Sequence, residues 1–267
     1  MKRASASAKI NLALVVGPRR EDGYHEVATV LQRIDLADRV EIEPALDTRV
    51  TGFRGDTLVR HALDLLSADT GAHWHARIEK RIPVAAGLGG GSSDAAAALA
   101  LANGSLTQPL PPERLHVFAA RLGSDVPFFL TAGPQLATGR GIDLEPLELP
   151  QDFWIVLVLP RDLQKRSTGD VYAAFDGGAG FDERREALTA ALEAVRRPAD
   201  LAALPSNDLA SSPVAGELLA AGAFRADVSG AGPTVYGLFV HEREAKSAAL
   251  RFRASGRVWI TAPAWYG

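Results

Sequence analysis

Residues 83–94 read Pro-Val-Ala-Ala-Gly-Leu-Gly-Gly-Gly-Ser-Ser-Asp, between a strand-like pattern at 75–82 and a helix-like pattern at 93–103. Ser92 or Ser93 is expected to cap that helix. Glycine tolerates positive φ and close ligand approach, and a helix start offers unpaired amides and the positive end of its dipole. The glycine-rich segment therefore predicts an anion site, most directly one for phosphate.

This segment matches neither of two common phosphate motifs. A Walker A loop ends in Gly-Lys-Ser/Thr, and no lysine lies between Pro83 and Asp94. The dinucleotide fingerprint needs a third glycine where Ser92 stands. A flexible linker is the alternative, but the ordered patterns on both sides argue against it. The segment indicates a phosphate cradle of another kind.

Composition limits the number of domains and the classes of partner that this chain can have. The chain has 267 residues, 47% hydrophobic and 23% charged, which fits one large or two modest globular domains. A formal net charge of −3 gives no reason to expect nucleic acid or a membrane as partner. Without cysteine, disulfides and thiolate metal sites are excluded. No apolar run reaches the roughly 18 residues of a membrane span, and no signal region follows the basic start, so a cytoplasmic protein is expected.

Hydrophobic patterns predict mixed strands and helices in the first half and a βαββαβ order in the second. The first half is expected to hold strands at 6–16, 27–34, 39–44, 49–53 and 75–82, and helices at 57–66, 93–103 and 112–122. The second half is expected to follow a boundary at 144–152, with strands at 153–159, 224–228, 234–240 and 257–261, and helices at 168–175, 183–196, 214–221 and 242–254.

Two pairs of polar residues near the N-terminus are candidates for a site. Lys9 and Asn11 fall on one face of a strand, with an exposed strand face as the alternative. Tyr24 and His25 follow a glycine turn and have the chemistry to stack on a base or hydrogen-bond to it. A turn in which Tyr24 covers a core edge is the alternative. Either pair alone leaves both interpretations open.

A carboxylate and a second glycine-rich turn complete the candidates. Asp125 follows the predicted helix end, and Pro127 is expected to force Val126 out of the helical region. Such a carboxylate has the chemistry to accept a proton from a hydroxyl, although a plain helix-end turn is the simpler alternative. The turn at 229–233 joins two strands, and its glycines also permit close ligand approach. The histidines lack the spacing of metal ligands.

In order and spacing, these segments resemble the GHMP kinases over nearly the whole chain. Gly-Leu-Gly-Gly-Gly-Ser-Ser points to the superfamily. Asp-Gly-Tyr-His and Gly-Ser-Asp-Val-Pro-Phe-Phe point to members that act on a cytidine diphosphate ester of methylerythritol in the non-mevalonate isoprenoid pathway. The resembling segments are 8–12, 22–25, 83–95, 122–129 and 228–237.

The resemblance implies a two-domain α+β fold with the active site between the domains. Residues 1–148 would form an N-terminal domain like ribosomal S5 domain 2, and residues 149–267 a ferredoxin-like βαββαβ domain. It implies ATP as co-substrate, Mg²⁺, a small cytidine substrate, no nucleic-acid or membrane partner, and a monomer or homodimer. With eight residues before Lys9, no transit peptide is expected.

The resemblance also assigns roles to single residues. Asp125 would take the hydroxyl proton, and Lys9 would orient that carboxylate and offset charge on the transferred phosphoryl group. The ATP phosphates would be held by Pro83, Val84, Ala85, Ala86, Gly87, Leu88, Gly89, Gly90, Gly91, Ser92 and Ser93. The cytidine substrate would be held by Asn11, Tyr24, His25, Thr168 and Tyr172. Metal ligands are not assigned, and the Asn207-Asp208-Leu209 turn is given no catalytic role.

Three positions depart from the family pattern without touching Lys9, Asp125 or the glycine-rich segment. Ser7 replaces a usual proline, Thr57 stands where asparagine is expected, and Ala231 replaces a common serine or threonine. The departure at Thr57 leaves an adenosine contact unassigned. Another GHMP kinase, for homoserine, mevalonate or a sugar, and a non-catalytic nucleotide-binding regulator are the alternatives. Another GHMP kinase gives no reason for Tyr24, His25 and Tyr172. Lys9 and Asp125 together argue against the regulator, since a protein that only binds nucleotide does not need a base beside the γ-phosphate.

Overall fold

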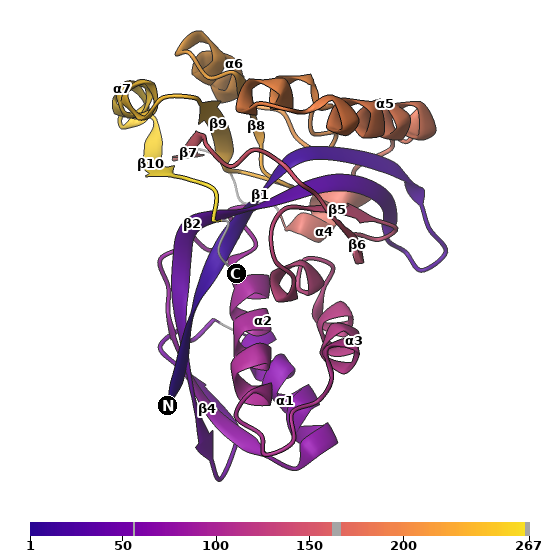
Figure 1. Cartoon of the computed structure of the whole chain (residues 1–267), viewed down its shortest axis with the longest axis vertical. Helices are drawn as coiled ribbons and strands as arrows, with labels where there is room; N and C mark the ends of the chain where they lie inside the picture. Colours follow the sequence, from indigo (N-terminus) through magenta and orange to yellow (C-terminus); the bar gives the residue numbers. More distant parts are fainter. Residues whose placement is uncertain (56, 162–166, 265–267) are drawn as a thin grey trace. The chain divides into compact units, whose positions relative to one another are not determined.

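The computed structural model describes residues 1–55, 57–161 and 167–264. It is an α+β fold with a six-stranded and a four-stranded sheet (Figure 1). The strands are β1 (Lys2–Arg19), β2 (His25–Ala45), β3 (Arg49–Thr51), β4 (His73–Glu79), β5 (Gln135–Thr138), β6 (Asp143–Pro146), β7 (Trp154–Pro160), β8 (Arg225–Val228), β9 (Val235–Phe239) and β10 (Gly256–Thr261).

Seven α-helices and two 3₁₀ helices occur in the described residues. No described helix has the length and apolar character needed to cross a membrane. The α-helices are α1 (Leu58–Thr70), α2 (Gly90–Asn103), α3 (Pro112–Leu122), α4 (Thr168–Ala173), α5 (Phe181–Ala194), α6 (Pro213–Ala220) and α7 (Glu242–Phe252), and the 3₁₀ helices are η1 (Pro127–Leu130) and η2 (Pro198–Ala203).

The six-stranded sheet has the order β3-β4-β2-β5-β6, and β1 also pairs with β2. The long strand β2 pairs with β5 through Thr29↔Ala137 and with β4 from Arg39↔Glu79 onward. The two separate strands expected at 27–34 and 39–44 form one strand, because the chain stays extended between the part of β2 that pairs with β5 and the part that pairs with β4. Within this strand, the Asp38 carboxylate accepts hydrogen bonds from the amides that follow β4. The short strands β5 and β6 were not predicted, and β6 overlaps the boundary expected at 144–152.

The second half confirms the predicted βαββαβ order, with β7, α5, β8, β9, α7 and β10 in sequence. Its sheet has the order β10-β7-β9-β8, and the pairs β10–β7, β7–β9 and β8–β9 are antiparallel. Helix α7 shows the hydrophobic periodicity on which this prediction rests. Its buried residues recur at the spacing that places them on one helix face, and they pack in the core of this sheet: Ala245, Ala248, Ala249 and Phe252.

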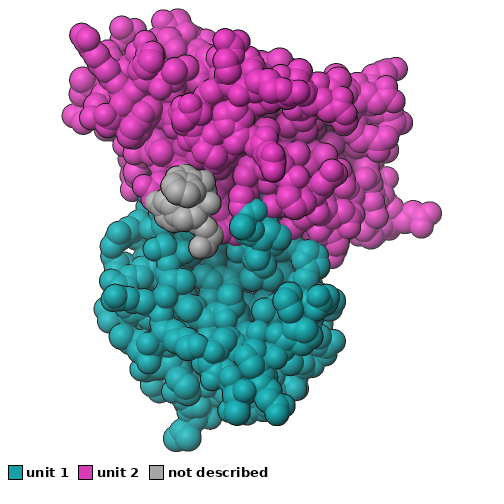
Figure 2. Space-filling view, in the orientation of Figure 1, with its two compact units in different colours: residues 1–8, 36–84, 89–132 teal, residues 9–35, 85–88, 133–267 magenta. Residues whose placement is uncertain are grey.

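Contacts between Cα atoms divide the chain into two compact units (Figure 2). In unit 1, α1 and α2 lie side by side, and Leu63, Trp74 and Leu99 share a core (Figure 1). Both units are built from interleaved segments and so do not test a single boundary along the sequence. The domain division at 148/149 therefore stays a prediction. Unit 1 comprises residues 1–8, 36–84 and 89–132, and unit 2 comprises residues 9–35, 85–88 and 133–267.

Candidate active site

The later part of the glycine-rich segment, in unit 1, is the start of helix α2. Gly89 adopts a left-handed conformation with φ of 68° and precedes the first helical residue, Gly90. The expectation that Ser92 or Ser93 caps the helix was wrong, because Gly89 tolerates the positive φ that lets the helix begin among the glycines. The amide of Ser93 donates to the Gly89 carbonyl at 2.9 Å. The amides before Ser93 are helix-start donors without intrahelical acceptors, as a phosphate cradle requires.

The earlier part of the segment, residues 85–88, belongs to unit 2 and is tied to the second glycine-rich turn. Thr234 donates its amide to the Ala86 carbonyl at 3.2 Å, and Ser229 donates its hydroxyl to the Gly87 carbonyl at 2.9 Å. Gly87 has φ of +80°, and a Cβ there would lie 2.2 Å from the Ser229 carbonyl oxygen. The contact of the two segments therefore requires glycine at position 87.

Lys9 and Asn11 are buried, at 4% and 5% exposure, so the exposed strand face is excluded for both. The Lys9 Nζ donates to Asn11 Oδ1 at 2.7 Å, and the Asn11 Nδ2 donates to Thr29 Oγ1 at 2.8 Å. The Lys9 amide donates to the Leu88 carbonyl at 3.0 Å. The Lys9 ammonium is thus held in a defined place in unit 2, and its backbone is bonded to the glycine-rich segment.

Asp125 lies in a tight turn between α3 and η1 of unit 1. Helix α3 ends at Leu122, as predicted, with Gly123 as its C-cap, and the Val126 amide donates to the Gly123 carbonyl at 3.2 Å. Val126 has φ of −65° and ψ of −43°, so the expectation that Pro127 forces it out of the helical region was wrong. Val126 immediately precedes a new 3₁₀ helix, whose first position suits proline. The turn still holds Asp125 half-buried.

The turn around Asp125 is packed on helix α2. Val126 is fully buried and shares a small core with Ala95 and Ala96, in the second turn of α2. Phe128 is also fully buried, with its ring centroid 5.1 Å from that of Phe129. The backbone next to Asp125 is therefore held against α2, the helix whose first residues belong to the glycine-rich segment.

His25 is the centre of an aromatic cluster in unit 2. Its ring centroid lies 5.8 Å from that of Tyr172 and 5.7 Å from that of Phe175. Its Nδ1 lies 2.9 Å from the Gly17 carbonyl oxygen. A carbonyl only accepts, so Nδ1 carries the hydrogen, and in the neutral ring Nε2 is an acceptor. The structure brings the predicted His25 and Tyr172 together and adds Phe175, an aromatic position that sequence reasoning missed.

The other predicted substrate residues are exposed. Tyr24 is 47% exposed, and the Arg140 guanidinium lies 5.1 Å from its ring centroid. Thr168 is the first residue of α4 and is exposed. Ser167 caps this helix by accepting a hydrogen bond from the Asp170 amide at 3.0 Å.

A buried ion cluster next to α2 was not predicted. The Lys80 Nζ donates to Asp38 Oδ2 at 2.5 Å and to Asp94 Oδ2 at 2.7 Å, and both carboxylates are fully buried. Burial lowers the pKa of Lys80, but the hydrogen bonds to Asp38 and Asp94 and the negative charges of these carboxylates together outweigh burial and leave the pKa above its ordinary value. Positions 38, 80 and 94 are too far apart in sequence for any local pattern to join them.

We expect Lys80→Met to lower the free energy of unfolding by about 3–5 kcal/mol, because it leaves two buried carboxylates without their shared cation. The Lys80 pKa is raised in the folded protein. The contribution of its charge to the free energy of unfolding is therefore complete at neutral pH and is lost only as pH rises through that raised pKa. Urea unfolding of both proteins at about pH 6 and pH 8 should therefore give the same difference.

Lys246→Met is the matched control for this measurement. Lys246 pairs with Glu242 at 2.8 Å on exposed positions of α7, so its loss should change stability by under about 0.5 kcal/mol. Equal small effects of the two substitutions would contradict the stabilising role of the buried cluster.

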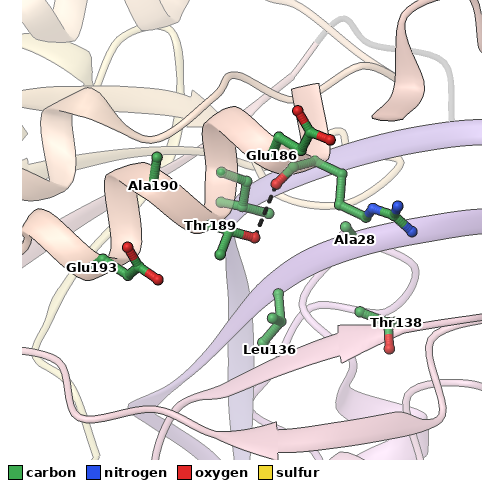
Figure 3. A pocket seen from close by; sticks show the side chains of 9 residues that line it. Ala28, Leu136, Thr138, Glu186, Thr189, Ala190 and Glu193 are labelled. Carbon is green, nitrogen blue, oxygen red and sulfur yellow. Dashed lines mark hydrogen bonds between the residues drawn. The ribbon is translucent and has the colours of Figure 1, made fainter. Parts of the chain in front are cut away.

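Unit 2 has a cavity of about 340 Å³ between α5 and the strands β2 and β5 (Figure 3). In it, the Thr189 hydroxyl donates to the Arg185 carbonyl at 3.1 Å. Its lining is Ala28, Leu136, Thr138, Arg185, Glu186, Leu188, Thr189, Ala190 and Glu193. The predicted site residues do not line this cavity. Across the described part of the chain, no group of three or more His, Cys, Asp or Glu side chains is arranged to hold a metal ion.

Comparison with known families matches both halves of the chain. Residues 57–133 match the GHMP kinases N terminal domain, and residues 184–258 match the GHMP kinases C terminal domain. A homoserine kinase from Cytophaga hutchinsonii, 15% identical, has a TM-score of 0.74 over 98% of this chain and 96% of its own. At that identity the likeness concerns the fold alone.

More similar proteins share one name. The 4-diphosphocytidyl-2-C-methyl-D-erythritol kinase of Pelotomaculum thermopropionicum is 40% identical over 94% of this chain and 93% of its own. The protein of that name from Geobacter sulfurreducens is 40% identical over 96% of each chain. A crystal structure of 4-(cytidine 5'-diphospho)-2C-methyl-D-erythritol kinase, 33% identical, has a TM-score of 0.80 over 100% of both chains. The chain therefore belongs to the GHMP kinases, within the family of the 4-diphosphocytidyl-2-C-methyl-D-erythritol kinases.

Proposed function

We propose that this kinase transfers the terminal phosphoryl group of ATP to the 2-hydroxyl of 4-diphosphocytidyl-2-C-methyl-D-erythritol. One observation carries the proposal: the sequence is 40% identical to relatives named for that substrate, over 94% and 96% of this chain. The buried Lys9 and the cluster of His25 with Tyr172 supply side chains suited to phosphoryl transfer and to base binding. We place the reaction in the cytoplasm, with a monomer or homodimer as the working form.

The ATP phosphates are proposed to bind along residues 83–93. Support comes from the open amides at the start of α2 and from the glycines, which leave room for close approach of an anion. Mg²⁺ would neutralise negative charge on the phosphate groups of ATP, and we assign it no protein ligand. Residues 85–88 are held in unit 2 by the 229–233 turn, which gives part of the cradle a fixed backbone.

Asp125 is proposed to accept the proton of the substrate hydroxyl. The hydroxyl oxygen then attacks the γ-phosphorus, the bond from that phosphorus to the bridging oxygen breaks, and ADP leaves. Lys9 is proposed to orient the carboxylate and to offset charge on the transferred group, as preorganised cations do in phosphoryl transfer. Lys9 is 4% exposed as a residue, and its ammonium is bonded to Asn11 before substrate binds, so little reorganisation is needed.

The cytosine base is proposed to bind at the aromatic residues of unit 2. The His25 Nε2 is an acceptor suited to the exocyclic amino group of cytosine, because Nδ1 is held by the Gly17 carbonyl. Tyr24 and Tyr172 offer flat faces on which a base can stack. Asn11 and Thr168 are proposed to hydrogen-bond the remainder of the substrate.

ADP release tests the choice of substrate. With equal ATP, we expect the cytidine diphosphate ester to give a higher kcat/KM than homoserine, mevalonate or galactose. Preferred turnover of one of the other three would contradict the proposal and indicate another GHMP kinase activity. ATP binding without turnover of any acceptor would favour the nucleotide-binding regulator.

A further inference from the structure

The side chain of Asn207 ties the second glycine-rich turn in place within unit 2. Its Nδ2 donates to the Val228 carbonyl at 2.9 Å and to the Gly230 carbonyl at 2.7 Å. Its Oδ1 accepts from the Leu209 amide at 2.8 Å, and its own amide donates to Asp227 Oδ2 at 2.8 Å. Both amide hydrogens and the amide oxygen of one side chain are therefore used to fix two backbone segments.

The neighbouring residue anchors this clamp to strand β1. The Asp208 amide donates to the Leu14 carbonyl at 3.0 Å, and Asp208 Oδ2 accepts from the Val16 amide at 2.8 Å. Arg184 from α5 pairs with the other oxygen of the Asp208 carboxylate. Residues 207 and 208 thus connect the strand that carries Lys9 to the turn at 229–233.

The turn held by Asn207 lies directly against the Lys9 side chain. A Cβ on Gly230 would lie 3.2 Å from Asn11 Oδ1 and 3.4 Å from Lys9 Nζ. On its other side the turn bonds to Gly87 through Ser229, and Thr234, which directly follows the turn, bonds to Ala86. A shift of this turn would therefore move both the wall beside the Lys9 ammonium and the support of the proposed phosphate cradle.

We propose that Asn207 is a positioning residue that sets the place of Lys9 and of residues 85–88 through the 229–233 turn, without touching substrate. This inference rests on the proposed function, which gives Lys9 its part in phosphoryl transfer. A small displacement of a group that acts on the transition state lowers the rate much more than it lowers substrate affinity.

Asn207→Ala and Asn103→Ala form a matched pair for the test. Asn103, at the end of α2, likewise clamps a loop, with Nδ2 donating to the Leu110 carbonyl at 3.0 Å and Oδ1 accepting from its amide at 2.8 Å. Both substitutions should lower Tm. Only Asn207→Ala should also lower kcat, by about 10–100-fold, with KM for ATP and acceptor changed by less than about threefold. Equal kcat values for the two variants would overturn the inference.

Asn207→Asp keeps the size of the side chain and the acceptor for Leu209 but loses both donated hydrogen bonds, so kcat should fall here too. Hydrogen exchange supplies a readout that needs no turnover. Asn207→Ala should speed exchange at 228–234 and 85–88, and Asn103→Ala only at 104–111. Unchanged exchange at 228–234 would overturn the positioning role, whereas wild type that fails to phosphorylate the cytidine ester would overturn the proposed function instead.

Discussion

Asp125→Asn is expected to lower kcat by about 10²–10⁴-fold, because the amide cannot accept the proton that the substrate hydroxyl loses. The Kd of a non-hydrolysable ATP analogue should stay within about threefold of wild type, since the carboxylate acts in the transition state and not in nucleotide binding. The two measurements are steady-state ADP release and calorimetric binding of the analogue.

Asp64→Asn is the control for the loss of one carboxylate from unit 1. Asp64 pairs with Arg60 at 3.0 Å on exposed positions of α1, so kcat should be unchanged. Circular dichroism should give similar spectra for both variants, because Asp125 is only half-buried in its turn. An Asp125→Asn variant with near-wild-type kcat would show that another group takes the proton.

Lys9→Met is the second substitution with a large expected effect. It removes the cationic group of a residue that is 4% exposed and keeps an apolar chain of similar length. We expect kcat to fall by about 10²–10³-fold, the usual effect of removing one preorganised charge-stabilising donor. Stability should fall as well, because Asn11 Oδ1 loses the hydrogen bond from Lys9 Nζ.

Two further variants separate the charge of Lys9 from its position. Lys2→Met makes the same change near the start of β1, where the exposed Lys2 bonds to the Gly104 carbonyl, and should leave kcat unchanged. Lys9→Arg keeps the charge but places a planar fork beside Gly230, so only part of the activity should return. Full activity of Lys9→Met at equal folded concentration would rule out its proposed role.

The sequence predicted those parts of the fold that depend on local periodicity. Helix α7 and the strands of its sheet were recognised because their apolar residues follow the period of the element. Strands β5 and β6, of four residues each, are too short to carry such a pattern and exist through their pairing with β2 and with each other. The start of α2 was misplaced because the serines satisfy the usual cap preference while Gly89 satisfies the backbone geometry.

The candidate site also contains some residues that motifs predict and others that only the folded structure brings together. Lys9 with Asn11, and His25 with Tyr172, were proposed from motifs and lie in contact in the structure. The hydrogen bonds of Lys80 reach residues 42 and 14 positions away in the sequence. The hydrogen bonds of the Asn207 clamp reach residues 21 and 23 positions away, so only the folded chain brings either group together. Val126 shows a further limit, because the restriction before proline is a tendency that an adjoining 3₁₀ helix can override.

Phosphorus NMR of the reaction mixture tests the central claim most directly. With ATP, Mg²⁺ and the cytidine diphosphate ester, we expect a new phosphomonoester signal to grow in step with ADP while the two diphosphate signals of the ester persist. ADP accompanied only by inorganic phosphate, or loss of the ester's diphosphate signals, would contradict transfer of the phosphoryl group to the methylerythritol hydroxyl.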